Sequence, residues 1–264
     1  MSQTSQSARS SLVPDPERLG WMVLCLATAL IYLPLNRIMD GGGTVEIPLD
    51  QDVPLWPVWV VPYLAALAWW VIAGLWAGLN MDIRQLRLFA VRWIIACLIG
   101  YAAFVFFPTY MVRPKIEGDD WATRWLAHIY ANDRTYNAFP SMHLWLTTTI
   151  SLNWSEWKPR WRWLWWSIVA VVALSTVFTG QHWILDPIGG ILLALASHFV
   201  GPRVLARLTS GRAAATARNT TSPPISGGGG RPRTSAPHVR RKPGRATRSR
   251  LSPRRSGPTQ ASDG

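Results

Sequence analysis

The sequence predicts an all-α membrane protein in which a bundle of six transmembrane helices is followed by a disordered basic tail. Hydrophobic residues make up 49% of the 264 residues, 17 residues are tryptophan and only 16% are charged. A soluble domain of this length is usually more polar. Mean hydropathy is only +0.10 because the apolar first part is averaged with a strongly polar C-terminal part.

Six apolar segments carry the prediction of a membrane bundle. A helix of about 20 apolar residues crosses the roughly 30 Å hydrocarbon core of a bilayer. The segments are Gly20–Met39, Trp56–Leu79, Leu88–Phe107, Ser141–Trp154, Trp161–Thr179 and Pro187–Val204. The fourth is short and rich in threonine. The first lacks a small-x-small cleavage pattern after it, so we expect it to remain as an anchor. The chain then divides into a polar N-terminal segment (1–18), a membrane domain (19–210) and the tail (211–264).

The distribution of lysine and arginine predicts the orientation. With six spans, both termini and the short loops 80–87 and 155–160 share one side, and these segments carry most of the basic residues. Basic loops stay in the cytoplasm. The acidic loop 40–55, the long loop 108–140 and the turn at 180–186 then lie outside. We expect a multi-pass plasma-membrane protein with cytoplasmic termini.

The tail predicts a disordered cytoplasmic extension. It holds twelve lysines and arginines, one aspartate and almost no residue able to form a core. It therefore carries most of the formal net charge of +13. Attraction to anionic lipid headgroups is the alternative function. Nucleic-acid binding is disfavoured because no aromatic residue interrupts the basic run to stack on bases.

Two histidines mark the candidate site. His143 begins the fourth span and His182 lies between the fifth and sixth, so both fall on the extracytoplasmic side. Asp186 follows His182 by four residues, a spacing that lets its carboxylate hold one imidazole nitrogen. Arg113 follows the third span and offers a guanidinium fork suited to phosphate. Together these groups indicate phosphoryl transfer.

Three motifs carry a resemblance to a known family. "RP" at Arg113–Pro114, "PSMH" at Pro140–His143 and "STVFTGQHWILD" at Ser175–Asp186 are similar to the motifs of the type 2 phosphatidic acid phosphatase (PAP2) superfamily. The segments "IPLDQDVPLWPVWVVPYL" and "YNAFPSMH" resemble its branch containing inositol phosphorylceramide synthase, the Aur1-like proteins. The resemblance covers residues from about 45 to 200 and implies a six-span PAP2-like bundle.

Two positions depart from the superfamily's motifs. Phe106 occupies the place of a lysine seven residues before the arginine, and Thr176 replaces the arginine of the third motif. Two phosphate-binding cations are therefore missing. Lys115, Arg124 and Arg134 are the candidate substitutes.

The resemblance implies a reaction through a phosphohistidine. His182 is expected to attack phosphorus while Asp186 orients its imidazole. His143 is expected to protonate the departing alkoxide and then deprotonate the incoming alcohol or water. The scheme needs no metal and no cofactor.

The substrate implied is a membrane lipid that carries a phosphate ester. We expect Arg113, Ser141 and Ser175 to bind its phosphate oxygens, with Lys115 and Arg134 in support. Transfer of a phosphorylated headgroup to an alcohol is favoured over hydrolysis by the resemblance to the Aur1-like branch. The oligomeric state is not predicted.

Each residue also has a structural interpretation. Asp186, followed by proline, and Ser141 are both suited to cap a helix, and Arg113 could extend along the membrane interface. A non-catalytic lipid-binding or scaffold protein with a degenerate site is therefore the main rival. A transporter is disfavoured because few ionisable residues lie inside the spans.

Overall fold

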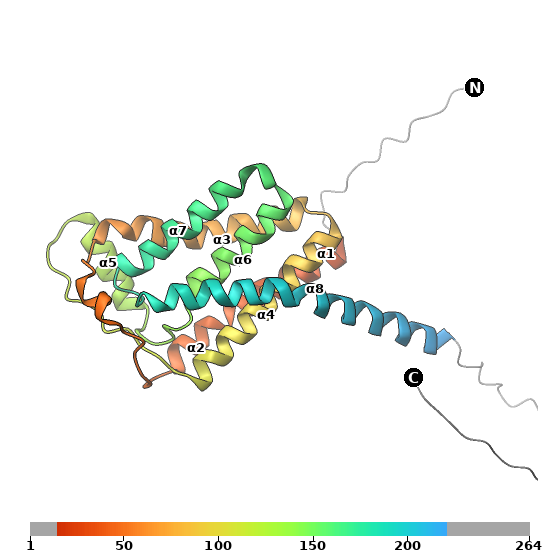
Figure 1. Cartoon of the computed structure of the whole chain (residues 1–264), viewed down its shortest axis with the longest axis horizontal. Helices are drawn as coiled ribbons and strands as arrows, with labels where there is room; N and C mark the ends of the chain where they lie inside the picture. Colours follow the sequence, from red (N-terminus) through yellow and green to blue (C-terminus); the bar gives the residue numbers. More distant parts are fainter. Residues whose placement is uncertain (1–14, 221–264) are drawn as a thin grey trace, which may run out of the picture. The chain divides into compact units, whose positions relative to one another are not determined.

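The computed structural model of the chain describes residues 15–220, with side chains to residue 211. This part is helical and contains no β-strand, which confirms the all-α prediction (Figure 1). Its α-helices are α1 (Pro16–Leu30), α2 (Tyr32–Ile38), α3 (Val60–Asn80), α4 (Ile83–Phe106), α5 (Trp121–Asn132), α6 (Met142–Trp157), α7 (Arg162–Phe178) and α8 (Leu185–Thr220). Short 3₁₀ helices occur at Pro48–Asp52, Pro57–Trp59 and Pro159–Trp161.

Five of the described helical segments are long and apolar enough to cross a membrane. They are Pro16–Ile38, Pro57–Asn80, Ile83–Phe106, Pro159–Phe178 and Leu185–Gly211. Large apolar side chains are exposed along them, as at Val71, Ile72 and Trp76 of α3. Water would disfavour such surfaces and lipid favours them. The fold is therefore that of a multi-pass membrane protein.

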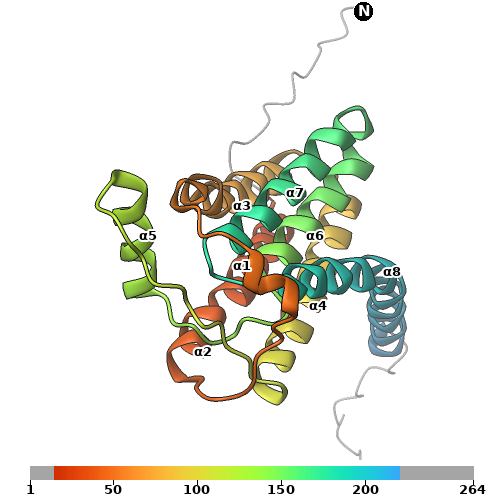
Figure 2. The same cartoon turned by 60° about the vertical axis from the view of Figure 1, so that its left-hand side comes forward.

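The fourth predicted span, α6, is not among these five. It has 16 residues, and its sequence includes three consecutive threonines, Thr147–Thr149, and Asn153. Eleven of the 16 residues are buried, so these polar groups are shielded from lipid by other helices. Figures 1 and 2 show α6 between α7 and α8. The count of six spans stays a prediction, because α6 is recognised by its burial and not by its hydropathy.

A buried polar cluster joins α4, α6 and α8 at the end of the bundle away from the predicted site. The Arg92 guanidinium is 3% exposed and donates to Asn153 Oδ1 at 2.7 Å and to Glu156 Oε2 at 2.6 Å. His198 Nε2 lies 3.2 Å from Glu156 Oε1. A buried charge needs such partners, so this cluster fixes how α6 is seated against its neighbours.

Three loops far apart in the sequence meet at the other end of the bundle. Gly43 forms a bridge with Thr109, and Tyr110 with Tyr136. The Ile184 amide donates to Asp50 Oδ1 at 2.8 Å. The loop 39–59, the loop 107–141 and the turn between α7 and α8 therefore share one end, as six alternating spans require. Figure 2 shows α5, which belongs to the second loop, to one side of α1 and α3.

The C-terminal boundary differs from the predicted one. Helix α8 continues to Thr220, so residues 211–220, which were assigned to the tail, are helical. The segment "GRAAATARNT" contains four alanines and two arginines, which have high helix propensity. The rest of the predicted tail, 221–264, and residues 1–14 of the N-terminal segment lie outside the described residues.

Candidate active site

The turn between α7 and α8 pairs His182 with Asp186. His182 Nδ1 lies 3.2 Å from Asp186 Oδ2, which also accepts the Trp183 amide at 2.9 Å. The two side chains are 8% and 0% exposed. A carboxylate accepts the proton of Nδ1, which leaves the lone pair on Nε2. Helix α8 begins at Leu185, so Asp186 lies inside its first turn and is not the residue before the helix.

Backbone contacts hold this turn in place. The amides of Gln181 and His182 both donate to the Thr176 carbonyl, at 3.0 and 3.1 Å. Gly180 adopts φ +59°, and a Cβ there would lie 2.6 Å from Tyr130 Oη. Glycine fits this left-handed position without strain. The position of the imidazole is therefore set by the chain on both sides of it.

The start of α6 brings a second set of groups to His182. Ser141 Oγ lies 3.1 Å from His182 Nε2, and the Ser141 amide donates to the Asp186 carbonyl at 2.9 Å. The ring centroids of His143 and His182 are 5.7 Å apart, with planes at 71°. The structure thus brings together four of the predicted residues, His143, His182, Asp186 and Ser141.

A close approach of α6 and α8 makes this meeting possible. A Cβ on Gly190 would lie 2.5 Å from the Ser141 carbonyl oxygen and 2.9 Å from Leu144 Cβ. Real side chains do not tolerate such distances. Gly190 therefore allows the helices to approach closely one turn after Asp186.

His143 is held from the side of α3. Its ring centroid is 4.4 Å from that of Tyr63 and 5.2 Å from that of Trp70. The Nε2 atom of His143 is buried and has no hydrogen-bond partner among the described residues. This nitrogen is thus free to exchange a proton with a bound molecule.

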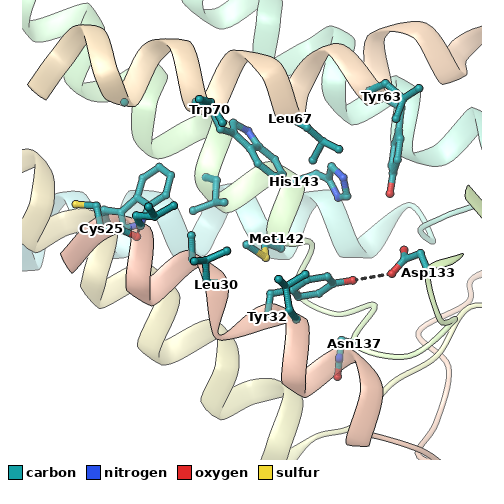
Figure 3. A pocket seen from close by; sticks show the side chains of 18 of the residues that line it. Cys25, Leu30, Tyr32, Tyr63, Leu67, Trp70, Asp133, Asn137, Met142 and His143 are labelled. Atoms are coloured by element: carbon teal, nitrogen blue, oxygen red, sulfur yellow. Dashed lines mark hydrogen bonds between the residues drawn. The ribbon is translucent and has the colours of Figure 1, made fainter. Parts of the chain in front are cut away.

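A cavity of about 780 Å³ connects the two histidines with an open apolar groove between α1 and α3. One end is lined by aliphatic and aromatic side chains, including Leu26, Leu30, Leu67 and Val71. Figure 3 shows the other end, where His143, Tyr63, Asp133 and the hydroxyl of Tyr32 lie near one another. A cavity of this size suits a molecule with an apolar body and a polar head.

Arg113 lies behind the cavity. Its guanidinium donates to the carbonyls of Tyr130 and Asp133 at 2.9 and 2.8 Å, and to Gln181 Oε1 at 2.8 Å. It also packs over the Tyr130 ring. These contacts join α5 to the turn that carries His182. Direct binding of phosphate by Arg113 stays a prediction.

The other predicted phosphate ligands are not gathered at His182. The Ser175 hydroxyl donates to the Val172 carbonyl of its own helix at 2.7 Å. Lys115 and Arg124 are exposed. Arg134 lines the cavity, where its guanidinium donates to the Arg37 carbonyl and packs over Tyr136. Their contribution to substrate binding stays a prediction.

Phe106 and Thr176 stand where the superfamily's motifs have basic residues, and neither side chain supplies a positive charge. Phe106 is 74% exposed near the end of α4, and Thr176 is fully buried, with its hydroxyl bonded to the Ala173 carbonyl. The Thr176 carbonyl accepts the amides of Gln181 and His182 and thus holds the His182 turn in place.

Sequence reasoning missed several polar residues of the cavity. Among them are Tyr63, Asp133, Asn137 and Gln181. Asp133 accepts the Tyr32 hydroxyl at 3.2 Å, and burial raises the pKa of its carboxyl even though Arg113 is close. Asn137 lies within "YNAFPSMH" and Gln181 within "STVFTGQHWILD". Their place in these motifs was the signal that could have identified them.

The comparison with protein families decides the assignment: residues 57–200 match the PAP2 superfamily. The chain belongs to the PAP2 superfamily. The comparisons with curated proteins and with solved structures give no match. The matched PAP2 segment begins at the 3₁₀ helix Pro57–Trp59 and ends within α8, so it includes Ser141, His143, His182 and Asp186. PAP2 membership makes the chain a phosphatase or phosphotransferase of lipid phosphate esters.

Proposed function

We propose that this PAP2 protein transfers a phosphorylated lipid headgroup to an alcohol through a covalent phosphohistidine. The observation that carries the proposal is the hydrogen-bonded series Asp186, His182 and Ser141 at the cavity, with distances of 3.2 and 3.1 Å. The carboxylate orients the imidazole and stabilises its positive charge, which leaves Nε2 as the nucleophile.

The reaction has two half-steps. In the first, His182 Nε2 forms a bond to phosphorus, the bond to the leaving alkoxide breaks, and the alkoxide takes a proton from His143. In the second, His143 removes the proton of the acceptor hydroxyl, whose oxygen displaces His182 from phosphorus. His143 returns to its starting state after each cycle. The ring centroids of His143 and His182 are 5.7 Å apart, so both imidazoles can reach one phosphoryl group bound beside them in the cavity.

Enclosure of the site favours transfer over hydrolysis. His182 is 8% exposed, and the cavity beside it is lined mainly by apolar side chains. A site that excludes water protects a reactive intermediate until another acceptor arrives. The similarity of "YNAFPSMH" to the Aur1-like branch supports the same choice. Hydrolysis shares the first half-step and is the second candidate.

The substrate we propose is a membrane lipid whose chains lie in the apolar part of the cavity. The site then belongs to the extracytoplasmic side, with α6 as the fourth of six spans and both termini in the cytoplasm, because basic residues gather at the other side. The plasma membrane is the proposed location. Contacts of the basic tail with anionic lipids stay a prediction.

Labelling the phosphate of a candidate donor lipid tests the proposal. Purified full-length protein in detergent is incubated with the labelled lipid, quenched, and examined for an acid-labile, base-stable adduct. The adduct is expected on His182, absent from His182→Ala and unchanged in His238→Ala, which removes a histidine outside the described residues. Label appearing in an added alcohol supports transfer, whereas label released only as free phosphate or as the water-soluble phosphorylated headgroup supports hydrolysis. Turnover by His182→Ala at the wild-type rate would exclude the mechanism.

A further inference from the structure

The polar end of the cavity contains two buried carboxamides with unpaired atoms. Asn137 is 4% exposed, and within residues 15–211 neither its amide nitrogen nor its oxygen has a hydrogen-bond partner. Gln181 is 6% exposed, and its Nε2 is likewise unpaired. Both line the cavity that His143 and His182 line. A buried polar group without a partner costs about 1–3 kcal/mol, so two such groups at one cavity indicate a polar ligand.

The contact with Arg113 fixes the orientation of the Gln181 amide. Arg113 Nη2 donates to Gln181 Oε1 at 2.8 Å. A guanidinium has only donors, so the amide oxygen must face it and the NH₂ group must face the opposite way. Arg113 does not line the cavity, yet its charge polarises an amide that does. Gln181, the residue before His182, therefore extends the influence of this largely buried cation to the cavity.

Asn137 is held in an uncommon backbone conformation. Its φ is +62°, in the left-handed region that asparagine occupies more readily than most residues. It lies four residues before Ser141. Figure 3 shows Asn137 on the other side of Tyr32 from His143. The loop thus fixes this side chain in the wall of the cavity that His143 and His182 also line.

The charges around the site nearly cancel. Among the described residues that line the cavity, the charged ones other than histidine are Asp133 and Arg134. Behind them lie Arg113 and Asp186, so two arginines face two aspartates. A dianionic phosphate monoester would find little compensation in this environment. A monoanionic phosphodiester needs less, and neutral NH₂ donors can satisfy its oxygens.

We propose that Asn137 and Gln181 donate hydrogen bonds to the phosphate oxygens of the lipid, in place of the cations missing at positions 106 and 176. These two neutral donors select monoanionic phosphodiester lipids over dianionic monoesters. The inference deepens the proposed function and rests on it only in placing the phosphate beside His182.

Two lipids with matched chains test the selection. Dissociation constants of dioleoyl phosphatidylmethanol, a diester, and dioleoyl phosphatidic acid, a monoester, are measured at pH 8 with the full chain in dodecyl maltoside. We expect the diester to bind about 10-fold more tightly. Asn137→Gly, which suits the positive φ, and Gln181→Met should each weaken diester binding by about 10- to 100-fold, the effect of one hydrogen bond to a charged group.

Control variants separate this effect from a loss of structure. Gln85→Met makes the same exchange at an exposed position of α4 and should bind the diester as the wild type does. Gln181→Glu can keep the contact with Arg113 while it removes the donors, and should weaken diester binding further. Wild-type affinity in Asn137→Gly, Gln181→Met and Gln181→Glu, or equal or tighter binding of the monoester, would overturn the proposal. Diester-selective binding without any adduct on His182 would instead reject the proposed chemistry and leave this inference standing.

Discussion

Ser141 Oγ lies 3.1 Å from His182 Nε2, although the two residues are 41 positions apart, one just before α6 and the other in the turn before α8. The contact places a hydroxyl against the nitrogen expected to attack phosphorus. It depends on the seating of α6 against the start of α8, where the Ser141 amide donates to the Asp186 carbonyl. Changes on either helix should therefore affect the same step.

Loss of the Ser141 hydroxyl should slow the reaction without unfolding the protein. We expect Ser141→Ala to lower kcat about 10-fold, the equivalent of one net hydrogen bond. Turnover of a labelled donor lipid measures this. Ser197→Ala removes a buried hydroxyl that is bonded within α8 and should change kcat less than 2-fold. Equal rates for wild type and Ser141→Ala would remove Ser141 from the mechanism.

Neutralising Asp186 should be far more damaging. Asp186→Asn keeps an acceptor for the Trp183 amide but removes the charge that orients and stabilises the His182 imidazole. We expect kcat to fall by about 10²- to 10⁴-fold, the range seen when a carboxylate that orients a histidine is lost. Asp82→Asn, at the start of α4, keeps an N-cap and serves as the control. A fall of less than 5-fold would argue against the orienting role.

His143 should matter in proportion to the basicity of the leaving group. His143→Ala removes the proposed proton donor, so turnover of an alkyl ester should fall by about 10²-fold or more. A p-nitrophenyl ester leaves without protonation, and its burst of p-nitrophenol should stay within about 3-fold of wild type. Comparison of the two substrates checks this. Equal losses with both would assign His143 to binding instead of proton transfer.

The close contact at Gly190 should limit what this position tolerates. Gly190→Ala places a Cβ 2.5 Å from the Ser141 carbonyl, so α6 and α8 must separate. We expect a loss of stability of about 1–3 kcal/mol, typical of overpacking, and a fall in activity. Gly20→Ala in α1, where no atom lies within 4 Å of the added Cβ, should lower neither. Thermal unfolding in detergent and turnover measure the two effects.

The buried carboxyl of Asp133 should make stability depend on pH. Burial raises the pKa of Asp133 in the folded protein. Its protonated carboxyl therefore stabilises the fold at low pH, and this stabilisation is lost as the pH rises through the folded-state pKa. Asp133→Asn, which can still accept the Tyr32 hydroxyl, should therefore raise the melting temperature at pH 7–8. The gain should vanish near the ordinary carboxyl pKa of about 4. A lower melting temperature at pH 7–8 would contradict this.

Motif spacing predicted more about the site than about the rest of the molecule. The four-residue interval between His182 and Asp186 predicted their contact, and the order of the spans predicted that His143 would face them. Both depend on local geometry and on alternation across the membrane. The apolar segments likewise predicted the helical class, because length and hydropathy suffice to identify most membrane helices.

Spacing could not show which polar groups line the cavity. Lys115 and Arg124 were expected to replace missing cations, yet both are exposed, and the Arg113 guanidinium is occupied by carbonyls and by Gln181. The direction of a side chain on an irregular loop depends on long-range packing that one sequence does not reveal. For the same reason the sequence alone does not identify the uncharged Asn137 and Gln181 as cavity residues.

The enclosed position of α6 has a consequence for biogenesis. A segment with Thr147–Thr149 and Asn153 gains little by entering lipid alone, so its insertion relies on partner helices that shield these groups. One of those partners, α8, is made last. The proposed nucleophile, His182, and its neighbour Ser141 can therefore meet only after synthesis has passed residue 185, and a chain truncated before α8 should lack a stably seated α6.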